Sequence, residues 1–118
     1  MCGAGNDGSV YTQFPCKEEY MGYADQLHGG VISSLIDSAM TNCLFSQGKT
    51  AVTAELTVRY YKPVLIGINA VVRAWVEESY SKLSLVKAAL LQDEDVKVKA
   101  RGKFIEQTAL ARKRKNIV

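Results

Sequence analysis

One stretch of the chain repeats apolar and polar pairs at the spacing of a helix. From Val31 onward, apolar pairs recur every four positions and polar pairs fill the gaps between them. This period predicts a helix from Gly30 to Ser46, ending near Gly48, with one apolar stripe and one polar stripe. The apolar pairs are Val31/Ile32, Leu35/Ile36, Ala39/Met40 and Cys43/Leu44.

The polar stripe of this helix lacks the Lys and Glu residues that normally cover a solvated helix face. It carries small hydroxyl and amide side chains, and Asp37 is its single carboxylate. We therefore expect the helix to be covered on most sides, and Asp37 to lie in a partly buried site.

Alternating or continuous apolar patterns predict five strands, at residues 9–16, 50–61, 69–80, 83–92 and 96–108. Pro15 favours a sheet edge for the first strand, and the glycine-rich residues 1–8 are expected to be irregular. The second strand alternates strictly, which predicts one face made of Val52, Ala54, Leu56, Val58 and Tyr60, and an opposite face made of Thr53, Glu55, Thr57, Arg59 and Tyr61.

The order of one strand, one helix and four strands indicates an α+β domain with an antiparallel sheet on one side of the helix. We expect a single domain over residues 1–118, in which residues 109–118 form a basic C-terminal tail. One helix has only one sheet to lie on. If both of its stripes are covered, a second chain must cover the other one, so the pattern predicts an oligomer.

Composition narrows the class of protein. The 118 residues are 47% hydrophobic and 23% charged, which is typical of a soluble globular domain. The odd set of three cysteines predicts no disulfide framework and favours the cytoplasm. A single histidine without a Cys-x-x-Cys pair argues against a metal site, and no cofactor is predicted. Neither a signal peptide nor a membrane helix is predicted.

The net charge of +3 comes from the tail. Without Arg112, Lys113, Arg114 and Lys115, 11 basic residues stand against 12 acidic ones. A solubilising tail is the favoured interpretation over a nucleic-acid-binding arm, so no nucleic-acid partner is predicted.

Gly29 and Gly30 stand at the predicted start of the helix, where backbone N–H groups lack intrahelical partners and the dipole is positive. Glycines there let a ligand approach the backbone, and such N–H groups stabilise the oxyanion that forms in acyl transfer. The alternative is that the glycines only form a tight entry turn. His28 either orients this turn through the backbone, which we favour, or contacts substrate.

Asp37 follows Gly30 by seven residues, roughly 10.5 Å along a helix. This is too far for Asp37 to activate a water at a carbonyl held by Gly30 of the same chain. A second helix running antiparallel across a two-fold axis would place each glycine turn opposite the partner's aspartate. The spacing therefore predicts a site shared between two subunits.

The row Lys97, Lys99, Arg101 and Lys103 is expected to be a solvated face. The alternative is that part of it, with Arg59 and Lys62, binds a phosphate-rich ligand such as coenzyme A (CoA). Aromatic residues such as Tyr60, Tyr61 and Trp75 either line an acyl pocket or, as is commoner, belong to the core. No Gly-x-Ser-x-Gly elbow supports a serine hydrolase.

At these residues the chain resembles the hotdog-fold acyl-CoA thioesterases of the phenylacetate-pathway type, whose hallmark is His-Gly-Gly followed by a helical Asp. The resemblance covers about residues 9–107. It is carried by Gly22-Tyr23, Leu27-His28-Gly29-Gly30, the residues 35–39, Ser46-Gln47-Gly48, the segment 51–60, Lys62-Pro63 with Gly67, and Arg101-Gly102-Lys103-Phe104.

The resemblance implies a long helix wrapped by a curved antiparallel sheet, assembled into homodimers or into homotetramers that are dimers of dimers. It implies thioester hydrolysis, with Gly29 or Gly30 polarising the carbonyl and Asp37 of the other subunit acting as base or nucleophile. His28 would support the turn, and Thr53 would help to place the water. Some members carry Asn or Gln in the loop before the glycines; here either Gln26 takes that role or the role is empty.

The residues expected to bind substrate are Gln26, Arg59, Lys62, Arg101 and Lys103. The first alternative function is a protein on the same scaffold that binds acyl-CoA, or another acyl ligand, without hydrolysing it. A hotdog hydratase or dehydratase is disfavoured because the single histidine precedes the glycines.

Overall fold

The computed structural model describes residues 2–4, 9–22 and 26–107, so the predicted basic tail lies outside the described residues. The predicted helix and five strands are confirmed in the predicted order, and the described residues also form one strand and one short helix that were not predicted. The elements are β1 (Cys2–Ala4), β2 (Val10–Phe14), the short 3-10 helix η1 (Glu18–Tyr20), α1 (Gly29–Ser46), β3 (Ala51–Tyr60), β4 (Ala70–Tyr80), β5 (Leu83–Gln92) and β6 (Asp95–Glu106). Within this part of the chain, no helix has the length and apolar character needed to cross a membrane.

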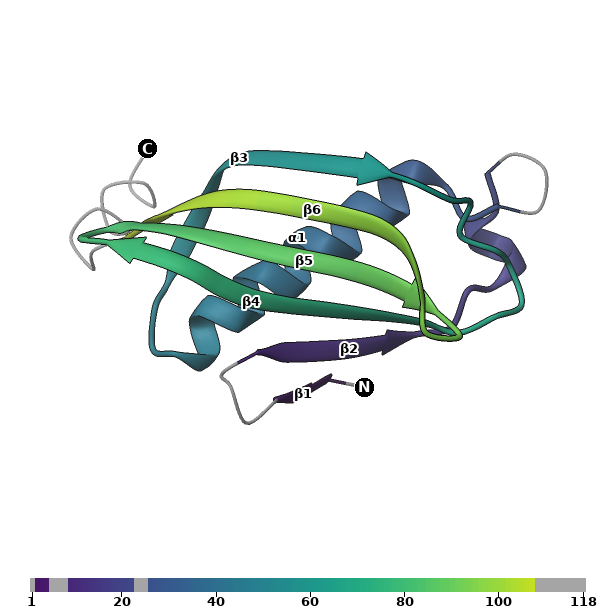
Figure 1. Cartoon of the computed structure of the whole chain (residues 1–118), viewed down its shortest axis with the longest axis horizontal. Helices are drawn as coiled ribbons and strands as arrows, with labels where there is room; N and C mark the ends of the chain where they lie inside the picture. Colours follow the sequence, from purple (N-terminus) through teal and green to yellow (C-terminus); the bar gives the residue numbers. More distant parts are fainter. Residues whose placement is uncertain (1, 5–8, 23–25, 108–118) are drawn as a thin grey trace.

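The strands form one antiparallel sheet in the order β1-β2-β4-β5-β6-β3, which curves around α1 (Figure 1). This is the α+β architecture that the sequence pattern predicted and the hotdog arrangement that the resemblance implied. Two expectations were wrong. Residues 2–4 form a strand, and they pair with β2, so β2 is not at the edge. Pro15 does not oppose this position because β2 ends at Phe14, before the proline could interrupt the ladder.

The apolar stripe of α1 packs against the inner face of the sheet. Its fully or almost fully buried residues are Ile32, Ile36, Ala39, Met40, Cys43 and Leu44. Burying each large aliphatic side chain of this kind stabilises a fold by about 1.5–3 kcal/mol. Packing is tight where β6 crosses the helix, because a Cβ at Gly102 would lie 2.6 Å from a ring carbon of Phe104 and 2.9 Å from the sulfur of Met40.

The polar stripe of α1 faces away from the sheet. Ser34, Ser38 and Asn42 are exposed in the single chain, whereas Asp37 is half-buried. Coverage of this stripe by a second chain therefore stays a prediction. The helix ends as predicted, because Gly48 adopts a φ of +79°, a conformation that favours glycine.

The strict alternation predicted for β3 is interrupted by a β-bulge. Thr53 pairs with Phe104 and Glu55 pairs with Lys103, so Ala54 is an extra residue without a partner on β6. The bulge moves Thr53 to the inner face, together with Leu56, and leaves Val52 exposed on the outer face. The predicted faces were therefore correct from Glu55 onward and reversed at Val52 and Thr53, on the other side of the bulge.

Candidate active site

The glycine turn is built around His28, which caps the N-terminus of α1. Its Nδ1 accepts a hydrogen bond from the Gly30 N–H at 2.9 Å, and its carbonyl accepts from Val31 and Ile32 at 3.1 and 3.2 Å. A nitrogen that accepts a hydrogen bond carries no proton, so a neutral His28 holds its proton on Nε2. A Cβ at position 30 would lie 3.1 Å from this Nδ1, so a larger residue there would press against the capping imidazole.

The cap leaves one N–H of the turn available. Gly29 is the first residue of α1 and is exposed, and within the described residues no group accepts a hydrogen bond from its N–H. The sequence proposed Gly29 or Gly30 as the donor to a carbonyl. In the free chain, His28 already occupies the donor of Gly30, which leaves the Gly29 N–H at the positive end of the helix dipole.

Tyr60 fastens the end of β3 to this turn. Its hydroxyl donates to the Gly29 carbonyl at 3.2 Å and lies 2.9 Å from Oγ of Ser33. The sequence analysis missed this role, because it favoured a core position for Tyr60, whereas the side chain is half exposed, at 49%. The signal that could have indicated this role was the position of Tyr60 on the face of β3 that is directed toward α1.

Asp37 lies against Thr53. The Thr53 hydroxyl donates to Oδ1 of Asp37 at 2.6 Å, and the side chain of Thr41 bonds the Asp37 carbonyl at 2.9 Å. The bulge at Ala54 creates this pair, since a regular strand would point Thr53 to the outer face. The structure thus brings together the proposed base and the hydroxyl residue that the resemblance assigned to water placement.

A hollow of about 420 Å³ lies beside the glycine turn. Gln26, Gly29, Tyr60 and Lys62 are among the residues that line it, and Asp37 is not. Lys62 forms an ion pair with Asp95 at 2.8 Å, and this hydrogen bond is the main reason why the pKa of Asp95 lies below its usual value. The loop before α1 is held there by the Leu27 N–H, which donates to the Val64 carbonyl at 2.7 Å.

Gln92 anchors the connection that forms one wall of this hollow. Although almost fully buried, its side-chain amide donates to the carbonyls of Leu65 and Ile68 and accepts from the Leu65 N–H, each at 2.9 Å. Sequence reasoning placed Gln92 only at the end of a strand. The one available signal for this role in the sequence was a single amide side chain at the end of an apolar strand.

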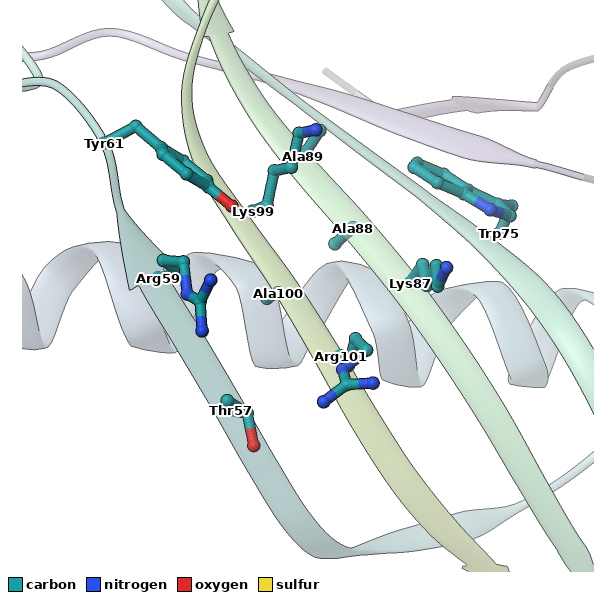
Figure 2. A pocket seen from close by; sticks show the side chains of 10 residues that line it. All are labelled: Thr57, Arg59, Tyr61, Trp75, Lys87, Ala88, Ala89, Lys99, Ala100 and Arg101. Carbon is teal, nitrogen blue, oxygen red and sulfur yellow. The ribbon is translucent and has the colours of Figure 1, made fainter.

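The other predicted substrate-binding residues lie elsewhere. Arg59 and Arg101 line a groove on the outer face of the sheet, on the side away from α1 (Figure 2). Lys103 is on the same face and lies 3.9 Å from a carboxylate oxygen of Glu55. The structure therefore separates Gln26 and Lys62, which are beside the glycine turn, from these three residues.

Comparisons with known proteins show the family to which the chain belongs. The family model of the thioesterase superfamily matches residues 25–99. The chain is 28% identical to human acyl-coenzyme A thioesterase 13 over 102 residues, which are 85% of this chain and 69% of the human protein.

Two solved structures show the same fold. The structure of smu.793 from Streptococcus mutans bound to acetyl CoA has a TM-score of 0.84 and 19% identity, over 90% of this chain and 86% of that one. The E. coli PaaI protein from the phenylacetic acid degradation operon has a TM-score of 0.82 and 20% identity, over 86% of this chain and 75% of that one. Because the family model spans the glycine turn, Asp37 and β3, and more than half of the chain, this protein belongs to the thioesterase superfamily.

Proposed function

We propose that this protein hydrolyses acyl-CoA thioesters at a site shared between two copies of the chain. The observation that carries the proposal is the arrangement along α1: an available N–H at Gly29, and a half-buried carboxylate at Asp37 held by Thr53. Family membership and the names of the relatives, an acyl-CoA thioesterase and a protein bound to acetyl CoA, support this substrate class.

A free sheet edge supports the sharing of the site. Strand β3 is the last in the sheet and is 10 residues long, so one row of its backbone N–H and C=O groups has no partner strand among the residues that the structure describes. Such an edge is a template for pairing with another strand. Antiparallel pairing of two β3 strands across a two-fold axis would bring two α1 helices onto the same side of a continuous sheet.

In the proposed reaction, the thioester carbonyl accepts a hydrogen bond from the Gly29 N–H of one copy. Asp37 of the other copy takes a proton from water while the water oxygen adds to the carbonyl carbon. The oxyanion that forms is stabilised by the N–H and the helix dipole. When the oxyanion collapses, the C–S bond breaks, and the CoA thiolate takes up the proton that Asp37 had accepted from water. If Asp37 is instead the nucleophile, its oxygen adds to the carbonyl carbon, the C–S bond breaks and the CoA thiolate leaves; water then cleaves the resulting anhydride and supplies the proton that the thiolate takes up.

The test is the steady-state release of free CoA from a panel of acyl-CoAs that includes short, medium and aryl acyl groups. Asp37→Asn keeps an acceptor for the Thr53 hydroxyl but removes the base, so kcat is expected to fall about 10²–10⁴-fold. Glu19→Gln is the matched control, since Glu19 is an exposed carboxylate on η1, and its rate should equal that of the unaltered protein.

Each result has a distinct meaning. Unchanged turnover in Asp37→Asn would refute the chemistry. Acyl-CoA binding without turnover of any member of the panel would instead favour the alternative, a non-catalytic acyl-CoA-binding protein on the same scaffold. After single-turnover hydrolysis in H₂¹⁸O, label in the carboxylate of Asp37 identifies the nucleophilic role, because water then attacks the Asp37 carbonyl of the anhydride.

A further inference from the structure

The outer face of the sheet contains a groove of about 480 Å³, a size typical of small-molecule sites. Among the described residues that line it, four carry a cationic side chain and none carries a carboxylate. Figure 2 shows these side chains on neighbouring strands, in front of the sheet, with α1 behind it. The cations are Arg59 on β3, Lys87 on β5, and Lys99 and Arg101 on β6.

The strand register places like charges directly opposite each other. Arg59 pairs with Lys99 across β3 and β6, and Lys87 pairs with Arg101 across β5 and β6. Like charges in directly opposed positions destabilise a sheet. The chain thus carries two repulsive pairs side by side, an arrangement that folding alone does not explain. A bound anion between the cations would replace this repulsion with attraction.

The two lysines of the groove have other partners. Lys87 forms an ion pair with Glu77 at 2.9 Å, and the Lys99 ammonium lies 5.8 Å from the centre of the Tyr61 ring. Arg59 and Arg101, in contrast, are exposed and have no carboxylate partner among the residues that the structure describes. Two available guanidinium groups on adjacent strands form a pair of planar forks, the geometry that binds phosphate oxygens bidentately.

Aromatic rings flank the cations. The Trp75 ring lies at one end of the groove and Tyr61 at the other (Figure 2). A nucleobase can stack on such a ring while its phosphates reach the cations. A second copy of the same face is a poor occupant, because it would add four more positive charges to the four already present.

We propose that this groove binds a nucleoside polyphosphate, with its phosphates between Arg59 and Arg101 and its base against a flanking aromatic ring. Two sources share this chemistry: a free nucleotide, and the nucleotide end of CoA. Binding of the nucleotide end of CoA rests on the proposed function, whereas the nucleotide site itself does not depend on it.

The experiment is isothermal titration calorimetry of the full chain with ADP and with CoA. Arg59→Ala and Arg101→Ala are each expected to weaken binding about ten- to a hundred-fold, the effect of losing a charged hydrogen-bonding partner. Arg59→Lys should give an intermediate affinity, since it keeps the charge but loses the fork. Lys82→Ala is the charge-matched control in the exposed β4–β5 turn and should bind like the unaltered chain.

A thermal melt of the same variants separates binding from folding. Removing Arg59 relieves repulsion with Lys99, so the melting temperature should stay constant or rise while affinity falls. A fall in melting temperature that accounts for the lost binding would overturn the proposal. So would failure of both ADP and CoA to bind the unaltered chain, or affinities that do not change in either arginine variant.

Competition kinetics identify the source of the phosphates. If ADP raises KM for the acyl-CoA at constant kcat, the groove holds the nucleotide end of the substrate; if ADP binds without changing KM, the groove takes a separate nucleotide. Both results support the site. Because calorimetry needs no turnover, Asp37→Asn should bind ADP as the unaltered chain does, even if the proposed hydrolysis is wrong.

Discussion

At the scale of single residues, the Tyr60 hydroxyl connects the proposed oxyanion donor to the sheet. It bonds the carbonyl of Gly29, the residue whose N–H is available, and it lies within hydrogen-bond distance of Ser33 one turn further along α1. Tyr60 does not need to touch substrate to matter. By holding the carbonyl of Gly29, it restricts the backbone of the residue whose N–H is available, and we therefore interpret it as a positioning residue.

We predict that Tyr60→Phe lowers kcat/KM by up to about ten-fold, the equivalent of one net hydrogen bond. The loss should fall mainly on kcat, because an oxyanion donor acts most strongly in the transition state. Tyr61→Phe is the matched control: Tyr61 is the adjacent exposed tyrosine, and Phe preserves the ring that faces Lys99. Equal kinetics for the two variants would remove the assigned role of Tyr60.

At the scale of elements, the connection from β3 to β4 forms a wall of the hollow because a buried side chain holds it. Gln92 at the end of β5 makes three hydrogen bonds to the backbone of residues 65 and 68. These groups lie beside the core, where unpaired backbone groups are costly. This stretch of the chain does not form a strand. The side-chain amide therefore supplies the hydrogen bonds that a neighbouring strand would otherwise provide to its backbone.

We predict that Gln92→Leu lowers the free energy of unfolding by about 1–3 kcal/mol for each buried backbone group that it leaves unpaired. Urea unfolding followed by circular dichroism measures the change. Asn69→Ala is the control, because Asn69 is an exposed amide in the same connection, and little change is expected. An unaltered midpoint for Gln92→Leu would mean that water replaces the amide at no cost.

At the scale of the whole molecule, the proposed site needs two chains. Gly29→Pro tests this, because proline removes the N–H of interest and is well tolerated at the first position of a helix. The preceding residue, His28, already has the extended backbone (ψ 135°) that proline requires before it. Asp37→Asn and Gly29→Pro therefore disable the two halves of the site independently.

We predict that each variant alone is nearly inactive, and that mixed dimers recover activity. In a shared-site dimer, one of the two sites of a mixed pair receives both intact residues, so random one-to-one assembly restores about a quarter of the activity. The matched control is the Asp37→Asn/Gly29→Pro double variant mixed with the unaltered chain, whose mixed pairs place one defect in each site. Absence of recovery in the first mixture would show that each site lies within one chain.

The parts of the candidate site that depend on residues close together in the sequence could be predicted. Glycines at a helix start, a carboxylate seven residues later and the helical period are visible in the sequence, so Gly29, Gly30, Asp37 and the distance between them followed from it. Thr53 entered through family resemblance, and the sequence placed it on the wrong face of β3. Tyr60 and Gln92 were missed because their partners are backbone groups of distant segments.

The sequence by itself determined the order of α1 and of the five strands β2 to β6, the apolar faces of α1 and β6, and the α+β class. These follow from periodicity and turn chemistry, which act over a few residues. Only the tertiary structure decided the position of β1, the bulge at Ala54, the Asp37–Thr53 pair and the gathering of four cations on one outer face. Apart from β1, which pairs with its sequence neighbour β2, each of these depends on the register between strands far apart in the chain, and a shift of one residue there turns a side chain to the opposite face of the sheet.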